Sequence, residues 1–302
     1  MVLDLEKIKR VKTLAQYIGL YESLIKELAN DPSKREISLI KINQRNKERR
    51  VVKVKSNTYK YILKVLALYL NEQYKTPDCV YGYVKGKSIL ENSKKHVEKT
   101  YILKADIKDF FYSISIDKVK NMFLSFSTND EIAELLSKLV TYDGKLYPGL
   151  ITSPIISNII LKNLDNDFIE LATKYNCVYS RYADDLTFSS NDLYPSKEEI
   201  EDILSRYDFN LNEKKFVIMK RGQTQVVTGL SVFDKKPRIP RKVKNKIRTA
   251  CFLYTKIPSE RYSKTVSWCS ITELEGLLNF YSKIEPEFIE KMKYLKRTGK
   301  YK

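Results

Sequence analysis

Residues 180–190 read SRYADDLTFSS and place two adjacent aspartates, Asp184 and Asp185, between two short runs that favour β-strand. Carboxylates that lie side by side repel each other and raise each other's pKa unless a positive group is near. The residues alone allow two interpretations. Either the end of the hairpin is exposed to water and the charges have no function, or a metal ion binds both carboxylates.

A third aspartate, Asp106, ends an apolar stretch that reads LKAD at residues 103–106. Two-metal nucleotidyl transfer needs carboxylates from separate elements that converge on Mg²⁺ ions about 4 Å apart. The end of a strand and the end of a hairpin suit this chemistry, because both are rigid and open on one side. Many proteins contain one aspartate followed later in the chain by a pair. The spacing by itself therefore supports nucleotidyl transfer only as a hypothesis.

The charge of the chain indicates a polyanionic partner. Its 55 Lys and Arg residues outnumber its 37 Asp and Glu residues, which gives a net charge of +18. Nucleic acid is the usual partner of such a protein. Residues 231–302 hold 18 basic and 7 acidic residues, and residues 235–248, KKPRIPRKVKNKIR, contain no acid. A solvated helix face is the alternative, but the neighbouring aromatic residues favour a phosphate-binding surface, although most of these rings are expected in the core.

Several function classes are disfavoured by composition. The four cysteines lack zinc-site spacing, so we expect reduced thiols. No apolar run is long enough to span a membrane, and the N-terminus lacks the apolar stretch of a signal peptide. We therefore expect a cytoplasmic protein with no membrane partner. His96 is the only histidine, which argues against Ser-His-Asp chemistry, HNH-type nucleases and His-rich metal sites.

Apolar periodicity predicts a mixture of helices and strands, and hence the α+β class. Ser153 and Pro154 are expected at the N-cap and the first position of one helix. The other expected elements are a helix over 11–28, a basic hairpin over 35–56, a helix over 60–72, a strand over 100–107, a helix over 130–140, a hairpin over 177–190, a helix over 196–206, strands over 214–220 and 225–232, and helices from 240 onward.

Four segments resemble, in order and spacing, the successive palm motifs of reverse transcriptases. They are LKADIKDFFYSI (103–114), YPGLITSPIISNIIL (147–161), SRYADDLTFSS (180–190) and NLNEKKF (210–216). The YADD form is typical of the bacterial branch that includes retrons and group II introns. GYVKGKSILENSKKHV (82–97) is similar to the fingers segment, and LEGLLNFYSKIEP (274–286) to the thumb segment. Within this set, NSKKH (92–96) and VTGL (227–230) resemble elements specific to retron enzymes.

The resemblance covers about residues 45–290 and implies a right-hand polymerase. The implied parts are fingers over 1–99, a palm with an antiparallel sheet over 100–232 and a basic helical thumb over 233–302. The implied activity is RNA-directed DNA synthesis from dNTPs. A retron enzyme extends a guanosine 2′-OH of its own structured non-coding RNA (msr–msd) and gives branched RNA–DNA (msDNA), commonly in antiphage defence with a separate effector protein. At this length we expect no RNase H, endonuclease or effector domain.

The resemblance also implies roles for individual residues around the metal site. Asp106 and Asp184 would bind both Mg²⁺ ions, and Asp185 would support the site through water or through the second ion. The backbone of Ile107, a candidate metal ligand, and of Lys108, a candidate nucleotide ligand, would face the triphosphate.

Four further residues match positions that contact the nucleotide. Arg50 matches the fingers arginine that binds the triphosphate, and Lys215 the lysine that protonates pyrophosphate as it leaves. Phe111 matches the steric gate against a 2′-OH, whereas we expect Phe110 in the core. Gly149 belongs to the loop that reads PQGxxxSP in the family. The alternatives are ordinary surface charges for Arg50 and Lys215, and a core pair for the two phenylalanines.

Candidate RNA-binding residues come from the two retron-like elements and from the basic run. For His96 the alternative is a structural role, with hydrogen bonds to neighbouring protein groups. For Gly229 the alternative is that glycine only permits a tight turn of the backbone. The candidates are Asn92, His96, Val227, Thr228, Gly229, Arg241, Lys242, Lys244 and Arg248.

The chain departs from the family pattern near the nucleotide. Tyr147-Pro148 stands where Pro-Gln is usual, Leu150 and Ile151 follow, and Phe216 replaces a threonine. These changes leave open a defence-associated reverse transcriptase outside the retrons, with atypical or untemplated synthesis. A second alternative is an RNA-binding scaffold with a vestigial polymerase site, against which the intact aspartates argue.

Overall fold

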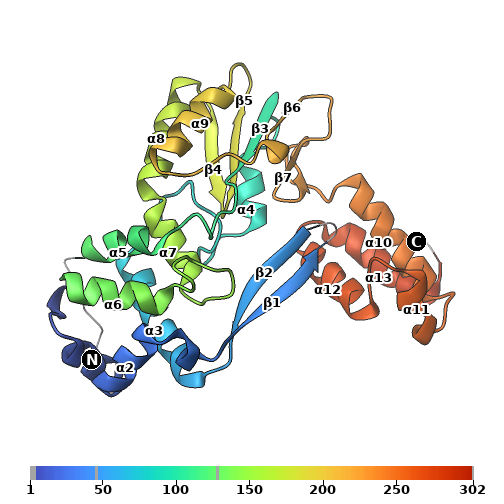
Figure 1. Ribbon diagram of the computed structural model, residues 1–302. Helices are drawn as coiled ribbons and strands as arrows, with labels where there is room; N and C mark the ends of the chain where they lie inside the picture. Colours follow the sequence, from blue (N-terminus) through green and yellow to red (C-terminus); the bar gives the residue numbers. More distant parts are fainter. Residues whose placement is uncertain (1–4, 45–46, 127–128, 301–302) are drawn as a thin grey trace.

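Figure 1 shows the computed structural model, which describes residues 5–44, 47–126 and 129–300. It combines helices with antiparallel sheets, as expected for the α+β class. Across these residues, no helix is both long enough and apolar enough to cross a membrane.

The N-terminal segment forms two helices where one was expected over 11–28. They are α1 (Val11–Ile18) and α2 (Glu22–Asn30). Gly19 ends α1 with φ of 77°, a left-handed conformation that glycine adopts without steric cost. Both helices bury apolar residues of the predicted face, Leu14 on α1 and Ile25 on α2. The apolar periodicity thus continues from one helix into the next, and for this reason it did not reveal the break between them.

The expected basic hairpin is confirmed as a separate two-stranded sheet. Strands β1 (Ile37–Gln44) and β2 (Lys47–Val54) pair antiparallel, and the hairpin extends away from the N-terminal helices (Figure 1). Helix α3 (Asn57–Gln73) follows. It begins after Ser56, because the Ser56 side chain accepts a hydrogen bond from the Tyr59 amide and caps the first turn. Helix α4 (Ile89–Lys94) precedes the palm.

The palm is built on a four-stranded antiparallel sheet in the order β4-β5-β3-β6. Its strands are β3 (Tyr101–Asp106), β4 (Val178–Tyr182), β5 (Asp185–Ser190) and β6 (Val217–Lys220). The accompanying helices are α5 (Ile116–Leu124), α6 (Asp130–Val140), α7 (Ser153–Ile160), α8 (Lys162–Lys174) and α9 (Lys197–Arg206). Helix α8 packs against β4, and α9 packs against α8 (Figure 1).

Two local predictions in the palm are wrong. The N-cap of α7 is Thr152, so Ser153 and Pro154 take the first two helical positions, where the Ser153 hydroxyl donates to the Tyr147 carbonyl at 2.8 Å. The single strand expected over 225–232 is a tight hairpin of β7 (Val226–Val227) and β8 (Leu230–Ser231). Thr228 and Gly229 between them both have positive φ, as a two-residue turn of type I′ requires.

The C-terminal part is helical, as expected. Its helices are α10 (Arg241–Tyr254), α11 (Ser259–Thr265), α12 (Ile271–Ser282) and α13 (Pro286–Thr298). These helices have their own apolar core, which runs from Ile239 to Leu295, whereas the main core is one cluster from Leu5 to Leu211. The division into fingers, palm and thumb at residues 99 and 232 stays a prediction, and the three names are used below for these ranges.

Candidate active site

The three aspartates lie at one end of the palm sheet. Strands β3 and β5 run antiparallel, and their register places Asp106, the last residue of β3, opposite Asp185, the first residue of β5. Ala183 and Asp184 form the turn between β4 and β5, where Ala183 has φ of 58°. The Ile107 amide donates to the Asp184 carbonyl at 3.1 Å, which ties the turn to the end of β3.

Burial and mutual repulsion shape the electrostatics of this cluster. Asp106 is only 2% exposed, and Asp184 and Asp185 are half-buried. Burial, together with the charges of Asp106 and Asp185, raises the pKa of Asp184 to about 6. Burial also raises the pKa of Asp185, although the positive charge of Lys104 opposes this shift. The carboxylates are therefore not those of a hydrated loop, and a cation would relieve their repulsion.

Two side chains from the segment before β6 bind Asp106. The Lys215 ammonium forms an ion pair with Asp106 Oδ2, and Asn212 Nδ2 donates to Oδ1 at 2.8 Å. Burial lowers the pKa of Lys215, but the hydrogen bond and charge of Asp106 outweigh it and raise the pKa overall. Sequence reasoning identified Lys215 and missed Asn212, although both belong to the same NEKK motif.

The donor set matches Mg²⁺ in kind but is not preassembled around an ion. In the described part of the chain, no group of three or more His, Cys, Asp or Glu side chains is arranged to hold a metal ion. Carboxylate oxygens are nevertheless the ligands that Mg²⁺ prefers, and three of them lie at this strand end. Ile107 is 1% exposed and apolar, so only its backbone carbonyl could join them. Metal binding would require Lys215 to release Asp106.

A cleft of about 440 Å³ lies next to the end of β3. The Lys108 amide donates to the Asn210 carbonyl at 2.8 Å, and both residues line the cleft. Tyr112, also in the lining, donates from its hydroxyl to the Arg50 carbonyl at 2.6 Å and so attaches the exposed part of β2 to the palm. The structure thus places the Arg50 backbone on Tyr112, beside the cleft that Lys108 lines, and the contact of both residues with a nucleotide stays a prediction.

The altered loop before α7 packs against the fingers hairpin. Gly149 has φ of 105°, and a Cβ there would lie 2.0 Å from the Val52 carbonyl oxygen, so no larger residue fits without a shift of the backbone. The Val52 amide donates to the Pro148 carbonyl at 2.8 Å. Tyr147 packs edge-on against the ring of Tyr112 at 5.0 Å. Gly149 therefore has a packing role, and its contact with a nucleotide stays a prediction.

Phe110 and Phe111 are both buried, at 5% and 7% exposure, and their ring centroids are 5.0 Å apart. Phe111 also contacts the ring of Tyr83, which is 44% exposed, at 6.1 Å. Phe111 thus lies where the core meets the surface. Its role as a steric gate stays a prediction.

A buried ion pair behind the catalytic turn was missed by sequence reasoning. Arg181 and Asp165 are both fully buried and form two parallel bonds, Nε–Oδ1 at 2.8 Å and Nη2–Oδ2 at 2.7 Å. Arg181 Nη1 also donates to the Ala183 carbonyl at 3.1 Å. A Cβ at Gly82 would lie 2.2 Å from the Ala183 amide nitrogen, so the fingers segment lies directly against this turn. An arginine directly before the YADD residues was the available signal.

Three residues of the first retron-like element, Asn92, Ser93 and His96, are buried, whereas Lys94 and Lys95 are exposed. His96 is 0% exposed, and its ring nitrogens are each 2.7 Å from a hydroxyl oxygen, that of Ser189 on β5 and that of Ser180 on β4. Burial, with the positive charges of Lys99 and Lys95, lowers the pKa of His96 to about 3. The imidazole is therefore neutral and joins β4 to β5, the two strands that flank the turn with Asp184.

The second retron-like element packs on the first. The Ser93 hydroxyl donates to the Val227 carbonyl at 2.8 Å, and Asn92 Nδ2 donates to Thr228 Oγ1 at 3.5 Å. Asn92 and Val227 are 1% and 0% exposed. The side chains of Asn92, His96 and Val227 are thus enclosed by protein, and the RNA contact expected for them stays a prediction. Within this group, Gly229 is exposed and Thr228 partly so.

The basic residues of α10 differ in their surroundings. Arg241 and Lys242 are exposed at the start of the helix. Lys244 forms an ion pair with the buried Glu285 at 2.5 Å, and Arg248 donates to Asn245 Oδ1 at 2.9 Å. Half of the predicted RNA-binding set on α10 is thus also engaged within the thumb.

The antiparallel palm, the fingers hairpin and the helical C-terminal part define the class of right-hand nucleic-acid polymerases. The family described as reverse transcriptase (RNA-dependent DNA polymerase) matches residues 40–250, which is more than half of the chain. The chain therefore belongs to the reverse transcriptase family, and its relatives place it among the retron-type members.

Three relatives carry this second step. The retron Mx65 reverse transcriptase of Myxococcus xanthus is 29% identical and covers 76% of this chain, which spans 56% of that protein. The retron Ec86 reverse transcriptase of Escherichia coli is 32% identical, over 55% of this chain and 53% of that protein. The retron Ec73 reverse transcriptase of Escherichia coli is 31% identical, over 72% of this chain and 76% of that protein. The chain thus spans little more than half the length of the first two.

Proposed function

We propose that this chain is the RNA-directed DNA polymerase of a retron. It copies part of its own structured non-coding RNA (msr–msd) from dNTPs into branched RNA–DNA (msDNA), and it serves antiphage defence with a separate effector protein. The observation that carries the polymerase assignment is the meeting of Asp106, Asp184 and Asp185 at one strand end in a member of the reverse transcriptase family. The retron assignment rests on the relatives and on the two retron-like elements.

Two bound Mg²⁺ ions would lower the pKa of the attacking hydroxyl and stabilise the charge on the leaving oxygen. Asp106 and Asp184 would hold them, and Asp185 would support the site. Arg50 binds the triphosphate, since a guanidinium donates two parallel bonds to phosphate oxygens. The primer hydroxyl loses its proton to water and forms a bond to the α-phosphorus while the bond to pyrophosphate breaks, and Lys215, once released from Asp106, donates a proton to the leaving pyrophosphate.

The first experiment is to purify the protein with its bound nucleic acid and to sequence that material before and after RNase and DNase treatment. We expect one structured RNA joined through a 2′-branch to a short, defined DNA. Asp184→Asn should carry the RNA without the DNA and lose primer extension by at least ~10²–10³-fold, as for removal of a group that stabilises the transition state. An Asp184→Asn protein that still makes DNA contradicts the assignment.

Tyr147 favours one alternative. Its ring packs against Tyr112 and Tyr142, at 5.0 and 5.3 Å, and so adds aromatic bulk near the cleft in a loop that usually carries glutamine. This observation supports a defence-associated reverse transcriptase with little use of a template. Random or homopolymeric DNA in the purified material would favour it over the retron assignment.

A further inference from the structure

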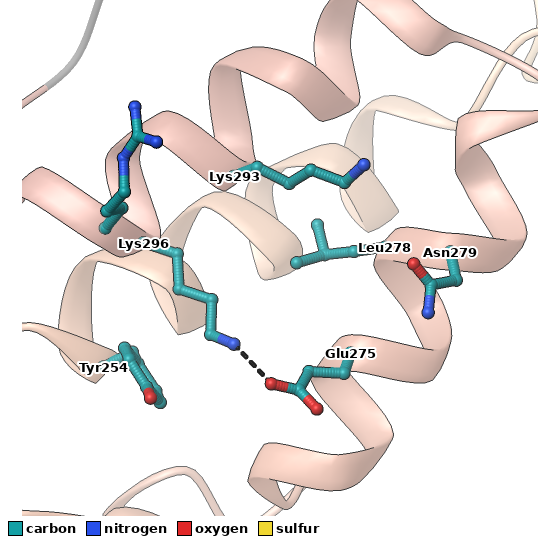
Figure 2. Close-up of a pocket in the computed structure, with 7 residues that line it drawn as sticks. Tyr254, Glu275, Leu278, Asn279, Lys293 and Lys296 are labelled. Carbon is teal, nitrogen blue, oxygen red and sulfur yellow. Dashed lines mark hydrogen bonds and ion pairs between the residues drawn. The ribbon is translucent and has the colours of Figure 1, made fainter.

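Among the grooves of the thumb, two differ clearly in character. Figure 2 shows the first, of about 580 Å³ between α12 and α13, where Lys296 and Glu275 form an ion pair at 2.8 Å across the opening. The second, of about 520 Å³, lies between α10 and α12 and is mainly apolar and aromatic. We call it the tryptophan groove. It is lined by Val243, Lys246, Ile247, Trp268, Cys269, Glu273, Gly276, Leu277 and Tyr281.

Trp268 is the only tryptophan of the chain, and it is partly exposed in this groove. Its ring packs against the thumb core, and the Lys246 ammonium lies 5.6 Å from the ring centroid. Tyr262, by contrast, is fully buried in the core. Trp268 and Tyr281 therefore present aromatic surface in an open groove, where a flat π-system can stack.

Gly276 keeps the groove open. It lies inside α12, where glycine destabilises a helix relative to alanine. Its presence there indicates a role in packing or in binding. A Cβ at this position would have no heavy atom within 4 Å, which means that the space beside it is empty. A long side chain here would project into that space.

The groove itself is lined by one cation and one carboxylate. Helix α10 has five basic residues and no acidic residue, and of these five Lys246 lines the groove. Of the described residues that line the groove, Glu273 alone carries a carboxylate, and it accepts a bond from the Ser270 amide at 2.7 Å in the capping box of α12. The groove thus places aromatic side chains beside a lysine on a strongly basic helix, and aromatic and cationic side chains together bind single-stranded nucleic acid.

We propose that the tryptophan groove binds an unpaired base of RNA, which stacks on Trp268 in place of the Lys246 ammonium that lies over the ring, while Lys246 turns to the adjacent phosphate. The inference rests on the proposed function, which gives this chain a structured RNA as ligand. Bases in a duplex are stacked within the helix, whereas loops and bulges offer their faces to aromatic side chains. The lone carboxylate, Glu273, is bound in its helix cap, so Lys246 is the group in the groove that can bind the phosphate.

Because Trp268 is the sole tryptophan, its fluorescence reports on this groove alone. We would titrate the full chain with single-stranded oligoadenylate RNA and with a blunt duplex RNA of the same length, and follow both the tryptophan emission and the anisotropy of labelled RNA. The expected result is saturable quenching by the single strand and little by the duplex. If the anisotropy shows that single-stranded RNA binds but the tryptophan emission stays unchanged, the proposal is overturned. The groove would then bind another ligand, such as a protein.

Three variants sharpen the test. Trp268→Leu keeps an apolar side chain but should weaken binding of the single strand by about 10- to 100-fold, whereas Trp268→Phe should keep most of the affinity. Gly276→Leu fills the groove and should abolish quenching, and Gly276→Ala is its matched control because its Cβ meets open space. Equal affinities for wild type and Trp268→Leu contradict the proposal.

The failure of this inference can be told apart from failure of the proposed function. Asp184→Asn removes a residue of the polymerase site and should respond to oligoadenylate as wild type does. If the wild-type chain shows quenching but no primer extension, the proposed RNA site in the groove is supported and the polymerase assignment is refuted. If it extends primers without quenching, the polymerase assignment is supported and the RNA site in the groove is refuted.

Discussion

At the residue scale, the site is governed by three carboxylates held close together without a full set of counter-charges. Lys215 and Asn212 bind Asp106, whereas the pKa of Asp184 is raised to about 6 by burial and by its two acidic neighbours. An ionised Asp184 is therefore unfavourable in the metal-free folded protein, and this has a measurable consequence for stability.

We expect metal-free protein to lose stability as the pH rises through about 6. The folded state holds a proton on Asp184 up to a pKa of about 6, and the unfolded state releases it near its ordinary value of about 4, so the free energy of unfolding falls between these values by roughly 1–3 kcal/mol. Asp184→Asn should therefore melt at a higher temperature than wild type at pH 8 in EDTA, and at a similar temperature at pH 4. A variant no more stable at pH 8 contradicts this.

His96 gives a dependence of opposite sign. Its pKa is lowered to about 3 in the folded protein, against about 6.5 when unfolded, so the stabilisation is complete above pH 6.5 and is lost as the pH falls. We expect a loss of roughly 1–2 kcal/mol between pH 6.5 and 5.

Urea unfolding in the Asp184→Asn background removes the titration of Asp184, and the difference between this background and its His96→Gln derivative measures the loss. Since His96 is the only histidine, His96→Gln should flatten the curve over that range. A slope that survives in His96→Gln would assign the titration to other groups.

At the element scale, the hairpin of β4 and β5 depends on what lies behind it. The Arg181–Asp165 pair joins β4 to α8, and the same guanidinium binds the carbonyl of Ala183 in the catalytic turn. Gly82 has no Cβ and so allows the fingers segment to lie directly against that turn. The turn is thereby fixed by elements that contribute no group to the chemistry.

We expect Arg181→Met to destabilise the protein by about 3–5 kcal/mol, because it leaves Asp165 buried and unpaired. The double variant Arg181→Met/Asp165→Leu removes both charges and should recover most of that stability in urea unfolding. Its kcat in primer extension should stay low, since the bond to the Ala183 carbonyl remains absent. Full recovery of kcat would make the pair a stabilising feature only.

At the scale of the whole molecule, the positive charge is concentrated in the helical C-terminal part. Residues 231–302 carry 18 of the 55 basic residues but only 7 of the 37 acidic ones. Counter-ion release makes nucleic-acid affinity fall with salt in proportion to the number of phosphates contacted.

We expect Arg241→Gln/Lys242→Gln to weaken RNA binding at every sequence tested and to reduce the slope of log K against log salt by about 1 for each cation that contacts a phosphate. Filter binding over a range of salt concentrations measures it. Lys12→Gln/Lys26→Gln removes the same charge from the N-terminal helices, at the far end from α10 in Figure 1, and should leave the slope unchanged. Equal effects of both pairs would indicate a general charge effect.

Local patterns in the sequence were sufficient for the class, for most elements and for the candidate aspartates. Helical and strand periodicities are properties of neighbouring residues, so the fingers hairpin and α6 could be predicted from them. The order of the motifs was likewise sufficient to place Asp106, Asp184 and Asp185 together, because a right-hand palm brings those segments to one sheet end.

Only the tertiary structure decided which polar residues face solvent and which are enclosed. His96 contacts Ser180 and Ser189, and Ser93 contacts Val227, across separations of 84, 93 and 134 residues. Burial and hydrogen bonding at such range depend on how the elements pack, and no periodicity within one element encodes it. For the same physical reason, sequence reasoning did not reveal that Ser93 and His96 make hydrogen bonds within the protein, nor that Arg181 pairs with Asp165 where α8 packs against β4.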